Sequence, residues 1–241
     1  MNDISDSERA RCAAELAERL LEARKLRESA RAEPRLAARR LILREWQAAR
    51  LARTHAELLA SPRYGRAAEF FLSDLYGAAD VSARDADLAR VLPLMTGMLP
   101  VSALRTILLA VEVDALSERL DAAMVAALGG RLEKGIGDAD YAAAYRKVGC
   151  RAERERQLDL IEATGQALDA VARKPLVRAT LRMMHGPAHL AGLGSLHEFL
   201  ERGFEAFHAM GRADEFLESV IGRERRILQA LFAGQEVPFG E

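Results

Sequence analysis

Four of the chain's five histidines lie in one stretch, MMHGPAHLAGLGSLHEFLERGFEAFHAMG, at residues 183–211. Its HEFLE segment, His197 to Glu201, differs by one residue from the HExxH signature, in which two histidines on one helical face bind zinc and the glutamate between them acts as a base. A carboxylate also ligates zinc, so His197 and Glu201 form a candidate ligand pair, with Glu198 as a candidate base. Because a catalytic zinc site needs a third protein ligand, this pattern is incomplete by itself.

A second spacing in the same stretch fits a different kind of metal site. Glu205 and His208 match the Glu-x-x-His pattern that occurs twice in ferritin-like di-iron bundles, but none of the other four histidines has a glutamate three residues before it. On a straight helix, His208 lies about 16 Å along the axis from His197, so the two histidines cannot share one ion. The candidate metal ligands are His197, Glu201, Glu205 and His208.

The same residues also fit an ordinary amphipathic helix, and this is the preferred interpretation. Leucines and phenylalanines recur along one stripe, and the four candidate ligands line its border, where histidine and glutamate are commonly half solvated. The apolar positions are Leu193, Leu196, Leu200, Phe204 and Phe207. No cofactor is therefore predicted.

His185 and His189 precede this segment. Proline is best tolerated at the first helical position, so Gly186-Pro187 is expected to end one helix and begin the next. His185 would then lie before the helix and His189 in its first turn, where packing is the preferred role for a neutral ring. In a metal-dependent centre, His189 is the residue expected to join His197 and Glu201.

The elements that carry these residues are predicted to be helices throughout. Alanine, leucine, arginine and glutamate dominate, β-branched residues are sparse, and apolar residues recur at spacings of three and four. Pro34, Gly129-Gly130 and Lys174-Pro175 mark helix boundaries, and no linker rich in glycine or serine separates domains. We expect an all-α, single-domain bundle of about nine helices.

The first helix, within residues 1–33, stands apart from the expected bundle at residues 34–241. Its narrow apolar stripe includes Cys12, Leu16 and Leu20, and such a stripe needs another surface to cover it. The helix is therefore a candidate oligomerisation appendage, and a homo-oligomer is expected.

Charge narrows the classes of partner. Lysine plus arginine (35) nearly cancels aspartate plus glutamate (36), so the whole chain offers no strong field to nucleic acid or an anionic membrane, and an electrostatic partner must meet a local patch. The clearest patch is the helix Arg35–Arg53, with six arginines against one glutamate. Solvation or pairing of these arginines is preferred over nucleic-acid binding.

Location follows from the apolar segments and the cysteines. The most apolar region, residues 91–113, is interrupted by two prolines and an arginine, so no membrane span is predicted. The charged N-terminus leaves no apolar run for a signal peptide, and the distant Cys12 and Cys150 are expected to be reduced. A cytoplasmic location is expected.

Two segments carry a family resemblance. AAEFFLSDLYGAADVSARDADLARVLPLM, at residues 67–95, and the later GLGSLHEFLERGFEAF resemble an uncharacterised group of bacterial all-helical proteins that share an FFLxDLYG element. The similarity extends over most of the chain after Pro34. It implies a helical fold, and no activity, cofactor or functional residue is carried over from it.

The FFLSDLYG element supplies the candidate structural or binding residues Phe70, Phe71, Asp74 and Tyr76. Its apolar residues cover most of the surface of a helical wheel, so this helix is expected to be central. A carboxylate in such surroundings needs partners. We expect Asp74 to tether helices by accepting hydrogen bonds from a helix N-terminus or by pairing with an arginine; a binding-site carboxylate is the alternative.

These patterns favour a non-catalytic function: a helical scaffold or regulatory protein that contacts itself or another protein. A metal-dependent enzyme, with zinc or non-haem iron at the His197/Glu201 helix, is the alternative, and nucleic-acid binding through Arg35–Arg53 is the weaker one. A binding protein is preferred over an enzyme.

Overall fold

The computed structural model describes residues 2–72, 86–92, 101–235 and 239, and every regular element in these ranges is helical. The expected all-α fold is confirmed. In chain order the elements are α1 (Asn2–Ala32), α2 (Pro34–Thr54), α3 (Ala56–Leu59), α4 (Gly65–Phe70), a helical segment at 86–92, α6 (Val101–Leu128), the 3-10 helix η2 (Gly129–Lys134), α7 (Asp138–Val148), α8 (Arg151–Ala172), α9 (Pro175–Leu190), α10 (Gly194–Met210) and α11 (Asp214–Ala233).

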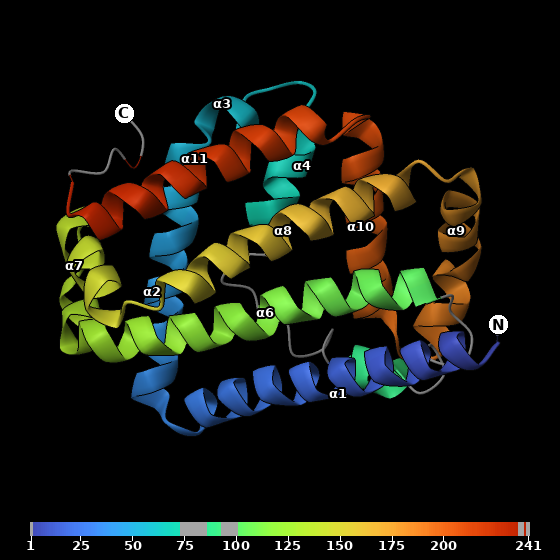
Figure 1. The fold of residues 1–241 in the computed structure, drawn as a ribbon, viewed down its shortest axis with the longest axis horizontal. Helices are drawn as coiled ribbons and strands as arrows, with labels where there is room; N and C mark the ends of the chain where they lie inside the picture. The colour runs from blue at the N-terminus through green and yellow to red at the C-terminus, as the bar shows by residue number, and fades with distance from the viewer. Residues whose placement is uncertain (1, 73–85, 93–100, 236–238, 240–241) are drawn as a thin grey trace.

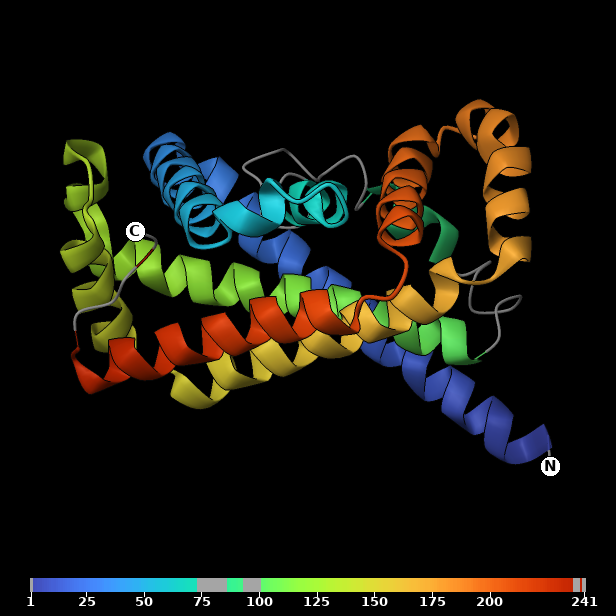
Figure 2. The same ribbon diagram turned by 90° about the horizontal axis from the view of Figure 1, so that it is seen from above.

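Two sets of helices cross in one bundle. Helices α1, α6, α8 and α11 run roughly side by side, with α1 against α6, α6 against α8 and α8 against α11 (Figure 1). Helices α2, α4, α10 and α9 stand across this row and lie on one side of it, as the view from above shows (Figure 2). Helix α7 lies at one end of the bundle and α9 at the other.

Prolines and glycines set several helix ends as the sequence predicts. Pro34 and Pro175 are the first residues of α2 and α9, a position where the missing amide leaves no partner unsatisfied. Helix α6 ends at Leu128, before Gly129, whose φ of 54° favours glycine. The chain breaks at His55, between α2 and α3.

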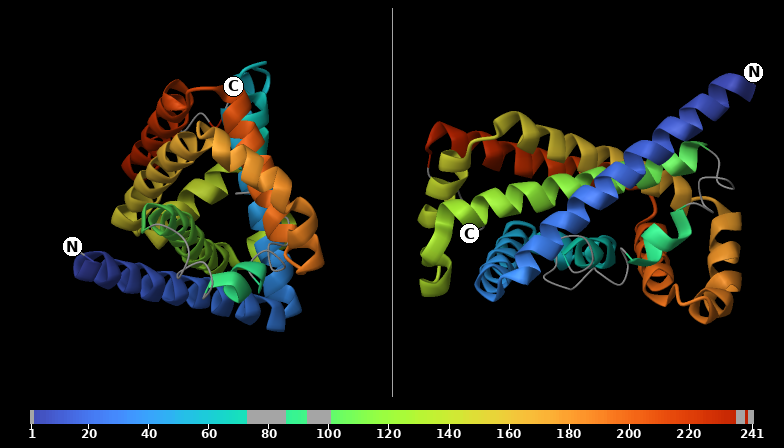
Figure 3. Two further views of the ribbon diagram at one scale, coloured as in Figure 1. Left: turned by 90° about the vertical axis from the view of Figure 1, so that its right-hand side faces the viewer. Right: turned by 90° about the horizontal axis from the view of Figure 1, so that it is seen from below.

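The N-terminal helix α1 packs against the bundle. Cys12, Leu16 and Ala23 are buried, and the helix runs along α6 and contacts α2. Only its N-terminal end projects past the other helices (Figure 3). The apolar stripe is therefore covered within the chain, so it no longer argues for self-association; the oligomeric state itself stays a prediction.

The core beneath α10 contains the described part of the FFLSDLYG element. Phe70 and Phe71 are buried, and the Phe71 ring lies 6.1 Å from Phe207 and 5.7 Å from Phe216, between centroids. Helix α10 approaches Phe70 closely at Gly203, where a Cβ would lie 2.8 Å from the ring. Phe70 and Phe71 thus support the helix that carries the candidate ligands. The other two residues predicted in this element, Asp74 and Tyr76, lie outside the described residues.

Cys12 and Cys150 are both free thiols, as the sequence predicts. Among the described helices, none has the length and apolar character needed to span a bilayer.

Candidate metal centre

Helices α9 and α10 form a hairpin that brings three histidines and two glutamates together. His185 and His189 lie on α9, and His197, Glu198 and Glu201 lie on α10. Residues 191–193 join the two helices, which pack against each other (Figure 1). The ring centroid of His185 lies 4.7 Å from that of His189 and 5.5 Å from that of His197.

The boundary between these helices differs from the sequence prediction. Helix α9 continues through Pro187 to Leu190, and α10 begins at Gly194. Proline disfavours a helical residue before it partly through a clash with that residue's Cβ, and Gly186 has no Cβ. The predictions that His185 precedes the helix and that His189 opens it are therefore wrong: both lie in the last two turns of α9.

His185, His197 and Glu201 lie close enough to one another to hold a metal ion. One ligand atom from each lies within 4.8 Å of the others. His185 Nδ1 is 3.1 Å from Glu201 Oε2, and His197 Nε2 is 3.4 Å from Glu201 Oε1. Ligands at about 2.1 Å from a tetrahedral ion are about 3.4 Å apart, so small side-chain adjustments would enclose an ion.

His197 is buried, whereas the sequence predicted a half-solvated position. The residue is 5% exposed, and its Nε2 makes no hydrogen bond with any described residue, because the contact with Glu201 lacks hydrogen-bond geometry. An unsatisfied buried polar group costs about 1–3 kcal/mol. Coordination of a cation by the neutral imidazole would remove this cost.

His189 and Glu198 lie beside these three residues. His189 Nε2 is 3.6 Å from Glu198 Oε1, and both side chains are close to half exposed. Gly194 makes room for the His189 ring, since a Cβ there would lie 2.8 Å from Nδ1. The pair therefore meets solvent next to the candidate ligands, where His189 could become a fourth ligand and Glu198 a base.

The helical segment at residues 86–92 fixes the start of α10. Asp87 Oδ2 accepts a hydrogen bond of 3.2 Å from the amide of Leu196, and Oδ1 accepts one of 2.6 Å from Arg90. Arg90 also donates to the Gly192 carbonyl at 3.0 Å. Because Asp87 is buried, its hydrogen bond to the Leu196 amide is largely shielded from water and holds the turn beside His197; the bond from Arg90 to Gly192 is exposed.

The other two predicted ligands lie away from this group. His208 Nδ1 donates to the Ala172 carbonyl at 3.2 Å, and its ring stacks on Phe204. Glu205 is exposed. Within the described ranges, the group of ligand atoms contains neither of them.

Sequence reasoning missed His185 as a candidate ligand, although the spacing of the histidines indicated it. His185 and His189 are four residues apart, as are His197 and Glu201. Two such pairs face each other when a short turn joins their helices. Treating Gly186-Pro187 as part of a helix would have revealed the second pair.

The chain matches a protein family over most of its length. The model of the family described as Domain of unknown function (DUF8198) matches residues 26–238. The chain belongs to this family. The DUF8198 match includes every residue of the candidate centre and begins within α1, and it confirms the expected membership of an uncharacterised family. No match was found among curated proteins or among solved structures.

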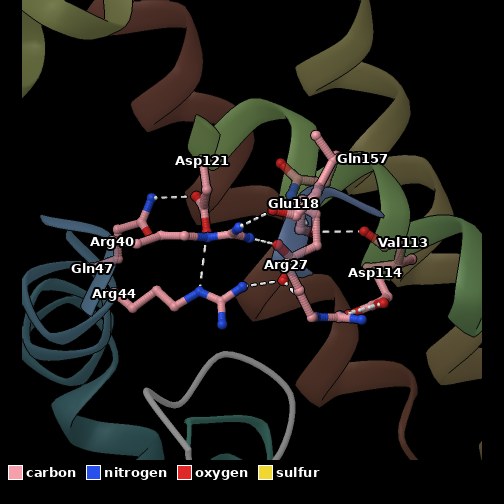
Figure 4. A network of polar contacts seen from close by, with 11 residues as sticks. Arg27, Arg40, Arg44, Gln47, Val113, Asp114, Glu118, Asp121 and Gln157 are labelled. Atoms are coloured by element: carbon pink, nitrogen blue, oxygen red, sulfur yellow. Dashed lines mark hydrogen bonds and ion pairs between the residues drawn. The ribbon is translucent and has the colours of Figure 1, made fainter. Parts of the chain in front are cut away.

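The arginine-rich helix α2 carries its charges in ion pairs. Arg40 and Arg44 both pair with Glu118 of α6, whose side chain is 1% exposed, and Arg27 of α1 donates to the same carboxylate at 3.0 Å (Figure 4). Burial and the charge of Arg44 lower the pKa of Arg40 to about 10, so its guanidinium stays protonated at neutral pH.

The remaining arginines of α2 are also paired. Arg35 and Arg39 contact Glu133, Arg50 contacts Glu224, and Arg53 contacts Asp138. All six arginines of the sequence patch therefore have an acidic neighbour. This pairing leaves less free positive charge for phosphate groups than the sequence indicates.

Proposed function

We propose that the protein binds one divalent transition-metal ion between α9 and α10, through His185, His197 and Glu201. The observation that carries this proposal is the buried Nε2 of His197, which makes no hydrogen bond and lies beside two further ligand atoms. A single exposed carboxylate would be weak evidence for a metal site. Two imidazoles and a carboxylate converging from two helices form a set that metal ions favour.

Zinc and ferrous iron suit this ligand set. Two histidines and one carboxylate occur in catalytic zinc sites and in non-haem iron sites, both of which keep a position open for water or substrate. The His185 side chain is 56% exposed. The open position would therefore face solvent.

An open position beside a base supports catalysis. A metal ion acts as a Lewis acid and lowers the pKa of a bound water. Glu198, whose Oε1 lies 3.6 Å from His189 Nε2 at the solvent side, would be the candidate base beside this centre, and His197 would hold the ion from the buried side. We therefore favour a metal-dependent enzyme of hydrolytic type over a non-catalytic scaffold.

Metal analysis of the untagged full-length protein tests the proposal. We expect one zinc or iron ion per chain after reconstitution, and loss of binding in both His197→Ala and His185→Ala. The second variant matters because His185 is exposed, so its loss should not disturb the fold. His208→Ala is the matched control on α10 and should keep the metal. No bound metal, or metal retained by both site variants, would overturn the proposal.

A further inference from the structure

Helix α9 exposes a stripe of large apolar side chains. Leu176, Met183 and Leu190 are 76%, 72% and 92% exposed, and their seven-residue spacing places them on one face of the helix. Five of the seven large apolar side chains exposed in the described ranges lie between residues 176 and 200. Exposed large apolar side chains are thus concentrated on α9 and the first half of α10.

Positive charge accompanies the stripe. Residues 170–197 contain no aspartate or glutamate. Lys174, Arg178 and Arg182 are exposed and pair with no described acidic residue. The nearly neutral chain therefore carries a local basic and apolar surface on α9, which is the kind of patch an anionic partner requires.

The stripe lies on a face of α9 that does not pack on the core. Helix α9 lies at the end of the bundle opposite α7, on the side where the N-terminal end of α1 also projects (Figure 2), and its inward face, with Val177 and Leu181, packs on the core. His185 and Glu201 meet on another face of the helix, toward α10. The apolar stripe is therefore exposed to solvent, and the candidate metal centre lies on a different face of α9.

We propose that α9 docks the protein on an anionic membrane surface. Leu176, Met183 and Leu190 enter the boundary between headgroups and acyl chains. Arg182, which directly precedes Met183, and Arg178, on the face that also carries His185, extend their long side chains past the edge of the stripe to the phosphates. Charge argues against a second copy as the occupant, because α9 itself carries no acidic residue that could pair with the cations of a second α9. The inference does not depend on a bound metal.

Vesicle flotation of the full-length protein tests this docking. We expect binding to phosphatidylcholine vesicles that contain phosphatidylglycerol, weaker binding to phosphatidylcholine alone, and release by salt. Met183→Gln with Leu190→Gln should weaken binding about tenfold through lost apolar contact. Arg178→Gln with Arg182→Gln should weaken it by about tenfold or more, at unchanged thermal stability.

Matched substitutions elsewhere serve as controls. Leu21→Gln with Leu41→Gln replaces two exposed leucines on α1 and α2, and Lys25→Gln with Lys147→Gln removes two exposed cations. Both pairs should bind vesicles as the unaltered protein does. Absence of binding to anionic vesicles, or equal weakening by the controls, overturns the proposal. It is also overturned if the α9 apolar variant changes the mass in light scattering while no vesicle binding occurs, since a second copy would then cover the stripe.

Discussion

Asp87 and Leu196 are joined by a hydrogen bond of 3.2 Å between a carboxylate oxygen and a backbone amide, 109 residues apart in the chain. Leu196 directly precedes His197, so this bond positions the first turn of the helix that carries the buried candidate ligand. Amides in the first turn of a helix have no partner within the helix, and a carboxylate also compensates the helix dipole there.

Replacement of Asp87 should therefore affect both stability and the metal centre. Asp87→Ala is expected to lower the free energy of unfolding by about 1–3 kcal/mol, because the Leu196 amide loses its partner. If the proposed centre binds metal, affinity should fall about tenfold as the turn loosens. Urea unfolding and a metal titration measure the two effects. Asp87→Asn keeps an oxygen acceptor and should lie between the two; equal behaviour of Asp87→Ala and the unaltered protein would show that the bond positions nothing.

Glu118 should be far more sensitive than an exposed carboxylate. Glu118→Gln leaves three buried or half-buried guanidiniums without their shared anion, and we expect a loss of about 3–5 kcal/mol in unfolding free energy. Glu133→Gln, which removes the exposed partner of Arg35 and Arg39, is the matched control and should leave the unfolding midpoint nearly unchanged. Similar effects of the two substitutions would contradict the role assigned to burial.

Glu224 should make stability depend on pH in the acid range. Burial would raise the pKa of Glu224, but the charge of Arg50 and hydrogen bonds from His55 and Arg50 outweigh burial and lower the pKa from 4.5 to about 2. Since the folded pKa lies below the unfolded one, the carboxylate stabilises the fold above pH 4.5, and this contribution is lost as the pH falls toward 2. Glu224→Gln should cost about 3 kcal/mol near neutral pH, with the difference shrinking across that window. Urea midpoints measured over a pH series would reveal it, and a difference independent of pH would assign the effect to packing instead.

Gly203 is expected to resist any added atom. A Cβ there would lie 2.8 Å from the Phe70 ring, which is itself packed against Phe71 and Phe199. Gly203→Ala should destabilise the fold by about 1–3 kcal/mol. Gly222→Ala is the control within α11, where the nearest atom lies at an ordinary 3.8 Å; it should gain about 1 kcal/mol from helix propensity. Thermal unfolding compares them, and a neutral Gly203→Ala would mean that α4 and α10 separate easily.

The helical fold could be predicted because its signals are local. Spacing of apolar residues identifies each helix, and Pro34 and Pro175 begin helices for a reason contained in their own chemistry. His55 shows where this reasoning ends. The helix breaks at His55, whose Nε2 lies 3.0 Å from Oε1 of Glu224 on α11. No local sequence pattern predicts this contact between distant residues.

Only part of the candidate centre could be predicted from the sequence. His197 and Glu201 share a helical face that the sequence shows directly, but His185 joins them through the packing of α9 on α10. The proline at 187 suggested a helix start, and the compatibility of Gly186 with a continued helix decides otherwise. Burial of His197 also depends on neighbours distant in the sequence, because Asp87 and Phe70 help to pack the segments around α10.

The ionic cluster around Glu118 has a consequence for how the helices are aligned. Arg27 donates to Asp114 and to Glu118, one turn apart on α6, while Arg44 also reaches Asp121 (Figure 4). A slip of α1 along α6 by one turn, about 5.4 Å, would carry Arg27 past one of these carboxylates. An interface made only of apolar side chains would lose little free energy in such a slip. A buried charge that loses its partner is strongly destabilising. The cluster therefore favours the observed register of α1, α2 and α6, because a one-turn slip would separate Arg27 from Asp114 or from Glu118.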